Sequence, residues 1–240
     1  MTPEVVYIIA GIAILPAIIF AVYAQVKVHS TFAKYSKVQN SRGLTGAALA
    51  EDLLRNNNCD VRVEKSHGHL SDHYDPKRKV VALSDGVYGS GSVAALGIAA
   101  HEVGHAVQDE QNYAPLKLRQ TVIKSTGLVH SFLLPLVIIG LLITPFLSMD
   151  SDLLYWILIG AVALYGFSFL ISVITLPTEF NASSRAMKML EESHLPPQDR
   201  KGARAVLRAA ALTYVAATII SLVYLLRFAA LLMMVADKRR

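Results

Sequence analysis

Charged residues are scarce in this chain of 240 residues. Asp, Glu, Lys and Arg make up 17% of it, against 53% for the hydrophobic residues, whereas soluble domains carry about 25% charged residues. The mean hydropathy of +0.43 is too apolar for an ordinary soluble domain of this length. The composition therefore predicts a membrane protein.

Other absences narrow the class of protein further. Cys59 is the only cysteine, which excludes an internal disulfide. The sequence has no basic segment before its first apolar run and no small-residue cleavage site before Lys27, so we expect a retained anchor rather than a cleaved signal peptide. The net charge is +5, but the chain lacks an aromatic-basic pattern for reading RNA, and much of the basic excess lies beside apolar runs. We therefore expect a lipid bilayer, and no nucleic acid, among its partners.

The most informative motif is His-Glu-x-x-His at residues 101–105, on a helix expected to begin after Ser92. Residues four apart lie on one helix face, so His101 and His105 can bind one zinc ion while Glu102 faces the water beside it. Zinc lowers the pKa of that water from about 15.7 toward about 7, and Glu102 can pass its proton to a leaving amine. Short motifs also arise by coincidence, but an unpaired Glu102 in so apolar a helix would be costly.

A catalytic zinc site normally has three protein ligands, and the metzincin spacing HExxHxxGxxH is absent after His105. Glu179 is the candidate third ligand, on a helix expected to start at Pro177. Ser183 would share its face, so Ser183 or Asn181 could hydrogen-bond to the ligands. Glu179 could equally complement the helix dipole at that N-terminus, and the residues alone leave both interpretations open.

Four segments together resemble the YugP-type neutral zinc metallopeptidases of bacterial membranes: residues 45–47 (Thr-Gly-Ala), 71–76 (Ser-Asp-His-Tyr-Asp-Pro), 95–108 around the HExxH motif, and 176–180 (Leu-Pro-Thr-Glu-Phe). The resemblance covers nearly the whole chain. It implies a gluzincin of the bacterial cell membrane, with His101, His105 and Glu179 as zinc ligands and Glu102 as base. The segment after Glu179 is similar, more distantly, to HtpX-type and CAAX prenyl proteases, which carry an aspartate where Ser183 stands.

Four apolar stretches can cross a hydrocarbon core of about 30 Å at about 1.5 Å per residue. They cover residues 5–26, 128–147, 153–176 and 209–235. The last contains Arg227, which is costly in a bilayer unless it snorkels, faces protein or pairs with an acid. We predict a mainly α-helical, multi-pass membrane protein with a small membrane-proximal α+β zincin-like region. Its parts are an anchor (1–26), a catalytic region (27–127), a transmembrane hairpin (128–176), a helix with the third ligand (177–208) and a C-terminal apolar helix, the expected fourth span (209–240).

Lysine and arginine set the expected orientation, because they favour the cytoplasmic side. Only Glu4 precedes the first span, whereas four basic residues follow it: Lys27, Lys34, Lys37 and Arg42. The N-terminus should then lie outside, and the histidines and Glu179 should share the cytoplasmic side. A full fourth span would place the basic C-terminus (238–240) outside, against the same rule.

A small polar region precedes the motif helix. We expect a helix over 44–56 starting near Thr45, and strands over 60–65 and 79–83. The second strand could be an edge that holds an extended peptide by main-chain hydrogen bonds, or could simply be paired within the sheet. His67, His69 and His73 form a local cluster. We expect them to form hydrogen bonds or line a cleft rather than bind a second metal ion, as loop histidines more often do.

An oxyanion donor beside the zinc is needed chemically. The sequence does not choose among its candidates, which are Arg185, His73, Tyr74 and His194. The residues at 72–76 could also border the substrate groove.

These observations favour a zinc endopeptidase that acts on proteins or peptides, membrane proteins among them. One alternative is a non-catalytic zinc-binding scaffold or chaperone subunit, which a fourth ligand such as His73 would favour. Another is a transporter, suggested by His130 and Arg227 in apolar segments, although the chain has no internal repeat. Small residues at 160–166 would also permit a homo-oligomer or a membrane partner.

Overall fold

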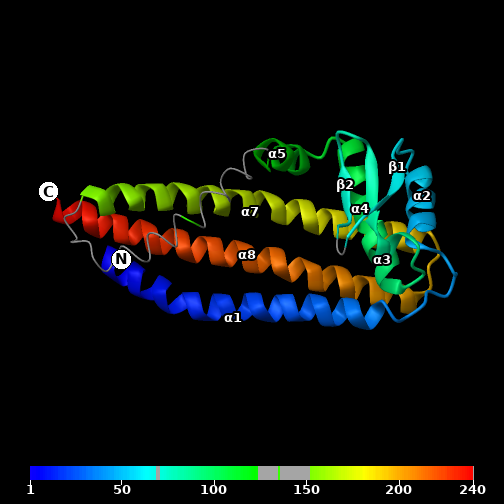
Figure 1. The fold of residues 1–240 in the computed structure, drawn as a ribbon, viewed down its shortest axis with the longest axis horizontal. Helices are drawn as coiled ribbons and strands as arrows, with labels where there is room; N and C mark the ends of the chain where they lie inside the picture. Colours follow the sequence, from blue (N-terminus) through cyan, green and yellow to red (C-terminus); the bar gives the residue numbers. More distant parts are fainter. Residues whose placement is uncertain (69–70, 124–134, 136–151, 240) are drawn as a thin grey trace. The chain divides into compact units, whose positions relative to one another are not determined.

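The computed structural model describes residues 1–68, 71–123, 135 and 152–239 (Figure 1). The chain divides into two compact units. The first, here the apolar unit, comprises Met1–Tyr23, Leu118–Thr175 and Tyr214–Arg240, and the second, here the mixed unit, comprises Ala24–Lys117 and Leu176–Thr213. Each unit is described below by itself.

Three helices in the described part of the chain are long and apolar enough to cross a membrane. They are α1 (Pro3–Tyr35), α7 (Asp152–Glu192) and α8 (Pro197–Lys238). Their most apolar windows have mean hydropathies of 2.8, 2.4 and 2.3, and they contain three of the four stretches expected to span. The remaining stretch, 128–147, lies outside the described residues apart from Pro135. The predicted fold class, a mainly helical protein with membrane helices, is confirmed.

The charge of Arg227 has a partner within the apolar unit. Its Nη2 donates to the hydroxyl of Tyr7 at 3.0 Å, and its Cζ lies 4.3 Å from the centre of the Tyr7 ring. Gly11 makes room for this arrangement, since a Cβ at that position would collide with the guanidinium. The contact with an aromatic ring and its hydroxyl compensates part of the cost of a charge in an apolar helix. Arg227 thus faces protein, one of the conditions that the sequence required.

The mixed unit contains a small sheet against helices. Besides parts of α1, α7 and α8, its elements in chain order are α2 (Gly46–Asn56), β1 (Arg62–Ser66), β2 (His73–Asp75), β3 (Val80–Ser84), α3 (Asp85–Tyr88) and α4 (Val93–Glu110). Helix α5 (Ala114–Ile123) follows and leads out of this unit. Thr45 caps α2 by accepting from the Ala48 amide at 3.2 Å, and Ser92 caps α4 by accepting from the Ala95 amide at 3.1 Å. Both expected helix starts are confirmed.

The strand order in the sheet is β1-β3-β2, with β1 parallel and β2 antiparallel to β3. The strand expected at 79–83 is therefore central, and the interpretation of this strand as a free edge is wrong. Its five residues are all buried, because a strand paired on both sides and covered by helices suits a continuous apolar run. The short strand β2 occupies an edge instead.

A close helix contact brings α4 and α7 together. A Cβ at Gly104 of α4 would lie 2.6 Å from the carbonyl oxygen of Ala182 in α7, so only glycine permits this approach. The expected helix start at Pro177 is wrong, since Pro177 lies inside α7. Proline removes one backbone hydrogen bond, but α7 continues through this position to Glu192. Glu179 consequently lies far from the N-terminus of its helix, and the helix-dipole interpretation no longer applies.

We expect Gly104→Ala to destabilise the protein by about 1–3 kcal/mol, because the added methyl group would push the two helices apart. The thermal unfolding midpoint in detergent measures the effect. Gly86→Ala in α3 is the control, since a Cβ there meets nothing within 4 Å. An unchanged midpoint for Gly104→Ala would contradict the close contact between the helices.

Candidate metal centre

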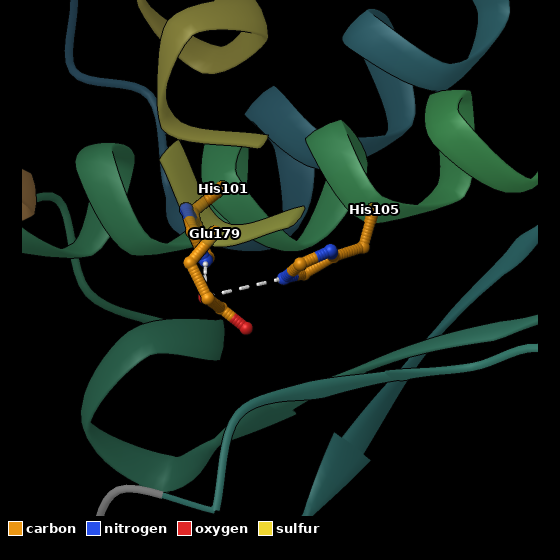
Figure 2. Close-up of side chains that lie close together, drawn as sticks. All are labelled: His101, His105 and Glu179. Carbon is orange, nitrogen blue, oxygen red and sulfur yellow. Dashed lines mark hydrogen bonds and ion pairs between the residues drawn. The ribbon is translucent and has the colours of Figure 1, made fainter. Parts of the chain in front are cut away.

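Three potential metal donors converge within the mixed unit (Figure 2). His101 and His105 come from α4, and Glu179 comes from α7. The Oε2 atom of Glu179 lies 3.1 Å from Nε2 of His101 and 3.6 Å from Nε2 of His105. One ligand atom from each residue lies within 4.8 Å of the other two. The i,i+4 spacing on α4 places both rings toward the same carboxylate.

The donor set fits zinc. Two imidazole nitrogens and one carboxylate oxygen are ligands that zinc accepts, and three protein ligands leave one position for water. Only 3% of Glu179 is exposed, and a buried carboxylate needs compensating partners. In the residues that the structure describes, the cluster includes no fourth His, Cys, Asp or Glu, so the arrangement is that of an open rather than a closed site.

The carboxylate of the cluster is held in its ionised form. Burial by itself would raise the pKa of Glu179, but the hydrogen bonds from His101 and His105 outweigh it and hold that pKa well below its usual range. Burial likewise would lower the pKa of His105, but the hydrogen bond to Glu179 and the nearby charge of Glu102 leave it raised. Glu179 is therefore an ionised carboxylate, the form in which it can bind a metal.

A buried glutamine orients His105. The Oε1 atom of Gln108 lies 2.9 Å from Nδ1 of His105, and Nε2 of Gln108 donates to the carbonyl of Thr178 at 2.8 Å and to Oδ1 of Asn181 at 2.9 Å. Gln108 is fully buried. When Nδ1–H of His105 donates to Gln108, Nε2 keeps its lone pair for a metal. Sequence reasoning missed this role, although a polar residue three positions after His105 in an apolar helix was a usable signal.

The second imidazole has a different support. Ser183 Oγ lies 3.2 Å from Nδ1 of His101, on the side of the ring opposite Glu179. The sequence placed Ser183 or Asn181 beside the ligands without choosing. In the structure Ser183 contacts His101 directly, and Asn181 reaches His105 only through Gln108.

Glu102 occupies the position between the two imidazoles in the sequence and is 8% exposed. It does not belong to the donor cluster, and its charge acts on the neighbouring His105. A carboxylate close to the cluster but outside it suits a base better than a ligand.

Arg185 is tied into the polar network rather than to the three donors. Its Nε donates to Oδ1 of Asn181 at 2.6 Å, and its Nη1 donates to Oε1 of Gln111 at 2.6 Å. Because Asn181 also contacts Gln108, the Arg185 guanidinium is linked by two hydrogen-bonded side chains to His105.

The other sequence candidates lie on β2 or at a helix end. Tyr74 donates from its hydroxyl to Oδ2 of Asp109 at 2.8 Å, and burial followed by this hydrogen bond raises its pKa. His73 is exposed, with Nδ1 at 2.8 Å from the Ser71 carbonyl. His194 is exposed just after α7. His69 lies outside the described residues, and neither His67 nor His73 joins a metal-donor cluster among the residues described.

Comparisons with known proteins agree with this chemistry. The profile of a family described as "putative neutral zinc metallopeptidase" matches residues 10–233. The chain is 44% identical over 209 residues to the "putative membrane protease YugP" of Bacillus subtilis (strain 168), which covers 86% of this chain and 88% of that protein. No solved structure matches the chain.

We expect Gln108→Ala to weaken zinc binding about 10- to 100-fold, because His105 would lose the partner that orients it. Zinc affinity by competition with a chelator measures the change. Gln198→Ala, an exposed glutamine of α8 whose amide contacts Ser41 rather than this network, should bind zinc as the wild type does. Equal zinc affinities for all three proteins would show that Gln108 does not support zinc binding.

Proposed function

The chain belongs to the neutral zinc metallopeptidase family, and on that premise we propose that it is a membrane endopeptidase in which His101, His105 and Glu179 hold the zinc ion. Zinc is its cofactor, and peptides or proteins are its substrates. The convergence of these three donors from two helices supports the assignment most directly. Family membership alone would leave the ligand residues open.

We assign the proton transfers to Glu102. A bound zinc ion would polarise a peptide carbonyl and lower the pKa of an attacking water toward about 7. Glu102 accepts a proton from that water and donates it to the nitrogen of the leaving amine. Its low exposure and its position beside the donor cluster support this role. Gln108 and Ser183 keep the imidazoles oriented, through Nδ1 of His105 and Nδ1 of His101 respectively.

The candidates for stabilising the oxyanion remain Arg185, His73, Tyr74 and His194. Tyr74 already donates its one hydroxyl proton to Asp109, so it would have to exchange a partner to act. Arg185 donates through Nε and Nη1, and Nη2 lies outside these two contacts. His73 is exposed on β2 and uses only Nδ1 in its contact with Ser71, so its Nε2 lies outside that contact. Hydrogen bonds from preorganised donors of this kind become stronger as negative charge develops on the carbonyl oxygen.

We place the substrate along β2. This strand lies at an edge of the sheet, and the hydrogen bond from Tyr74 to Asp109 joins it to the helix that carries the HExxH motif. An extended peptide can pair with an edge strand through main-chain groups, largely independent of its side chains. This geometry suits a protease with weak sequence preference.

The alternatives have less support. A structural zinc site normally closes all four positions, whereas three donors gather in the described part of the chain and His73 is not among them. The transporter interpretation drew on two polar residues in apolar segments. Arg227 is engaged with Tyr7, and His130 lies outside the described residues.

The distribution of basic residues supports a site on the cytoplasmic side of the cell membrane. Glu179 follows the apolar stretch 153–176 by three residues, so the proposed zinc site lies close to the membrane surface. Membrane proteins or peptides at the interface are accordingly the substrates that we propose.

We expect Glu102→Gln to keep its zinc and to lose about 10²- to 10⁴-fold in hydrolysis of an unfolded model protein, because a general base is removed while the ligands stay. Glu179→Ala should lose both zinc and activity. Zinc content and hydrolysis are measured in parallel on detergent-purified proteins. Glu110→Gln, at the exposed end of the same helix, is the matched control and should behave as the wild type.

Full hydrolysis by Glu102→Gln, with contaminating proteases excluded, would contradict the assignment of the base. A wild type that binds zinc tightly but cleaves nothing would favour the scaffold interpretation. Normal zinc content in Glu179→Ala would show that the third ligand is another residue.

The orientation is testable with single cysteines in a Cys59→Ser background. A membrane-impermeant maleimide should label Thr2→Cys in intact cells, because the N-terminus is expected outside. Lys188→Cys, at a well-exposed position of the mixed unit, should be labelled only after permeabilisation. The reverse pattern would place the site on the outer face.

A further inference from the structure

A groove of about 370 Å³ lies between α7 and α8 within the mixed unit. Its walls are formed by Phe180, Ser183, Ser184 and Met187 of α7 and by Arg204, Leu207, Arg208 and Ala211 of α8. None of these residues is acidic, and two are arginines. The groove is therefore positively charged along the α8 wall.

Arg204 and Arg208 are one helical turn apart, so their side chains project from the same face of α8. Both are exposed. By contrast, Arg200, one turn earlier and outside the groove, forms an ion pair with Glu191 at 2.5 Å. Two guanidinium groups on one face can bind the oxygens of a single phosphate by paired, charge-assisted hydrogen bonds.

The rest of the lining is apolar. Phe180 is 49% exposed although it is a large hydrophobic residue, and Met187, Leu207 and Ala211 share the groove with it. A free phosphate ion would use the arginines and gain nothing from these side chains. A ligand with both an anionic phosphate and a hydrocarbon chain would use both kinds of surface.

The sequence around the groove points to the membrane surface. Arg208 immediately precedes the apolar stretch 209–235, and Phe180 follows the stretch 153–176 by only four residues. Basic residues directly beside membrane-spanning segments meet lipid headgroups. Both walls of the groove thus connect directly to apolar segments of the length that crosses a bilayer.

We propose that this groove binds an anionic phospholipid, with Arg204 and Arg208 on its headgroup phosphate and with Phe180, Leu207 and Ala211 along the start of an acyl chain. The site is separate from the proposed zinc ligands, although Ser183 lines the groove and also contacts His101. Lipid binding must therefore be measured directly rather than inferred from proteolytic activity. The proposal does not depend on the protease assignment.

The experiment is native mass spectrometry of the full chain in a non-ionic detergent, titrated with phosphatidylglycerol or with phosphatidylcholine of the same acyl composition. Wild type is compared with Arg204→Gln, Arg208→Gln and the double variant. Lys201→Gln is the matched control, because it removes one positive charge from the same part of α8 at a residue that does not line the groove. Zinc content and the unfolding midpoint confirm that each variant is folded.

We expect tight binding of one phosphatidylglycerol by wild type and by Lys201→Gln, and a loss of about tenfold or more in the double variant, because two charge-assisted contacts are removed. Equal binding in all variants, or equal binding of phosphatidylcholine, would overturn the proposal. Displacement of the lipid by millimolar inorganic phosphate would identify an anion site without an acyl chain, and would overturn the lipid assignment. If the double variant fails to fold, the single variants and Arg208→Lys still decide the question.

Discussion

The contact of one buried carboxylate with two imidazoles is the interaction on which the mixed unit depends. Glu179 would be costly to bury alone, and His101 and His105 supply the hydrogen bonds that keep its pKa low. The contact joins α4 to α7, and it requires the backbones to approach as closely as Gly104 and Ala182 do. The features that make the cluster a candidate zinc site therefore also determine how these two helices pack.

Each imidazole has its own hydrogen-bond partner, and the partner of His105 is the more deeply buried of the two. His101 meets the hydroxyl of Ser183, whereas His105 meets the fully buried Gln108, which Thr178 and Asn181 hold from α7. Arg185 extends the second chain of contacts outward to Gln111. A buried polar network of this kind is stabilising only when its members are all paired. A substitution at Asn181 or Arg185 would therefore affect the orientation of His105 although neither residue contacts that ring.

Helices α7 and α8 each contain both an apolar stretch and residues of the mixed unit. Helix α7 contains an apolar stretch long enough to cross a bilayer and, a few residues later, Glu179. Helix α8 contains the basic face with Arg204 and Arg208 and, further along, Arg227, whose charge is placed against Tyr7. The candidate zinc ligand Glu179 and an apolar stretch long enough to span a bilayer thus belong to one continuous helix.

The sequence by itself determined the HExxH geometry, the apolar helices and the caps at Thr45 and Ser92, because these depend on local periodicity and side-chain chemistry. Only the tertiary structure decided that Glu179 meets the histidines, since Pro177 and Glu179 also fitted a helix N-terminus until α7 proved continuous. The role of Gln108 depends on a partner 70 residues away in the chain. The central place of β3 depends on its pairing with β1, 18 residues away, as well as with the nearby β2. Pairing across such distances follows from packing, which local pattern does not encode.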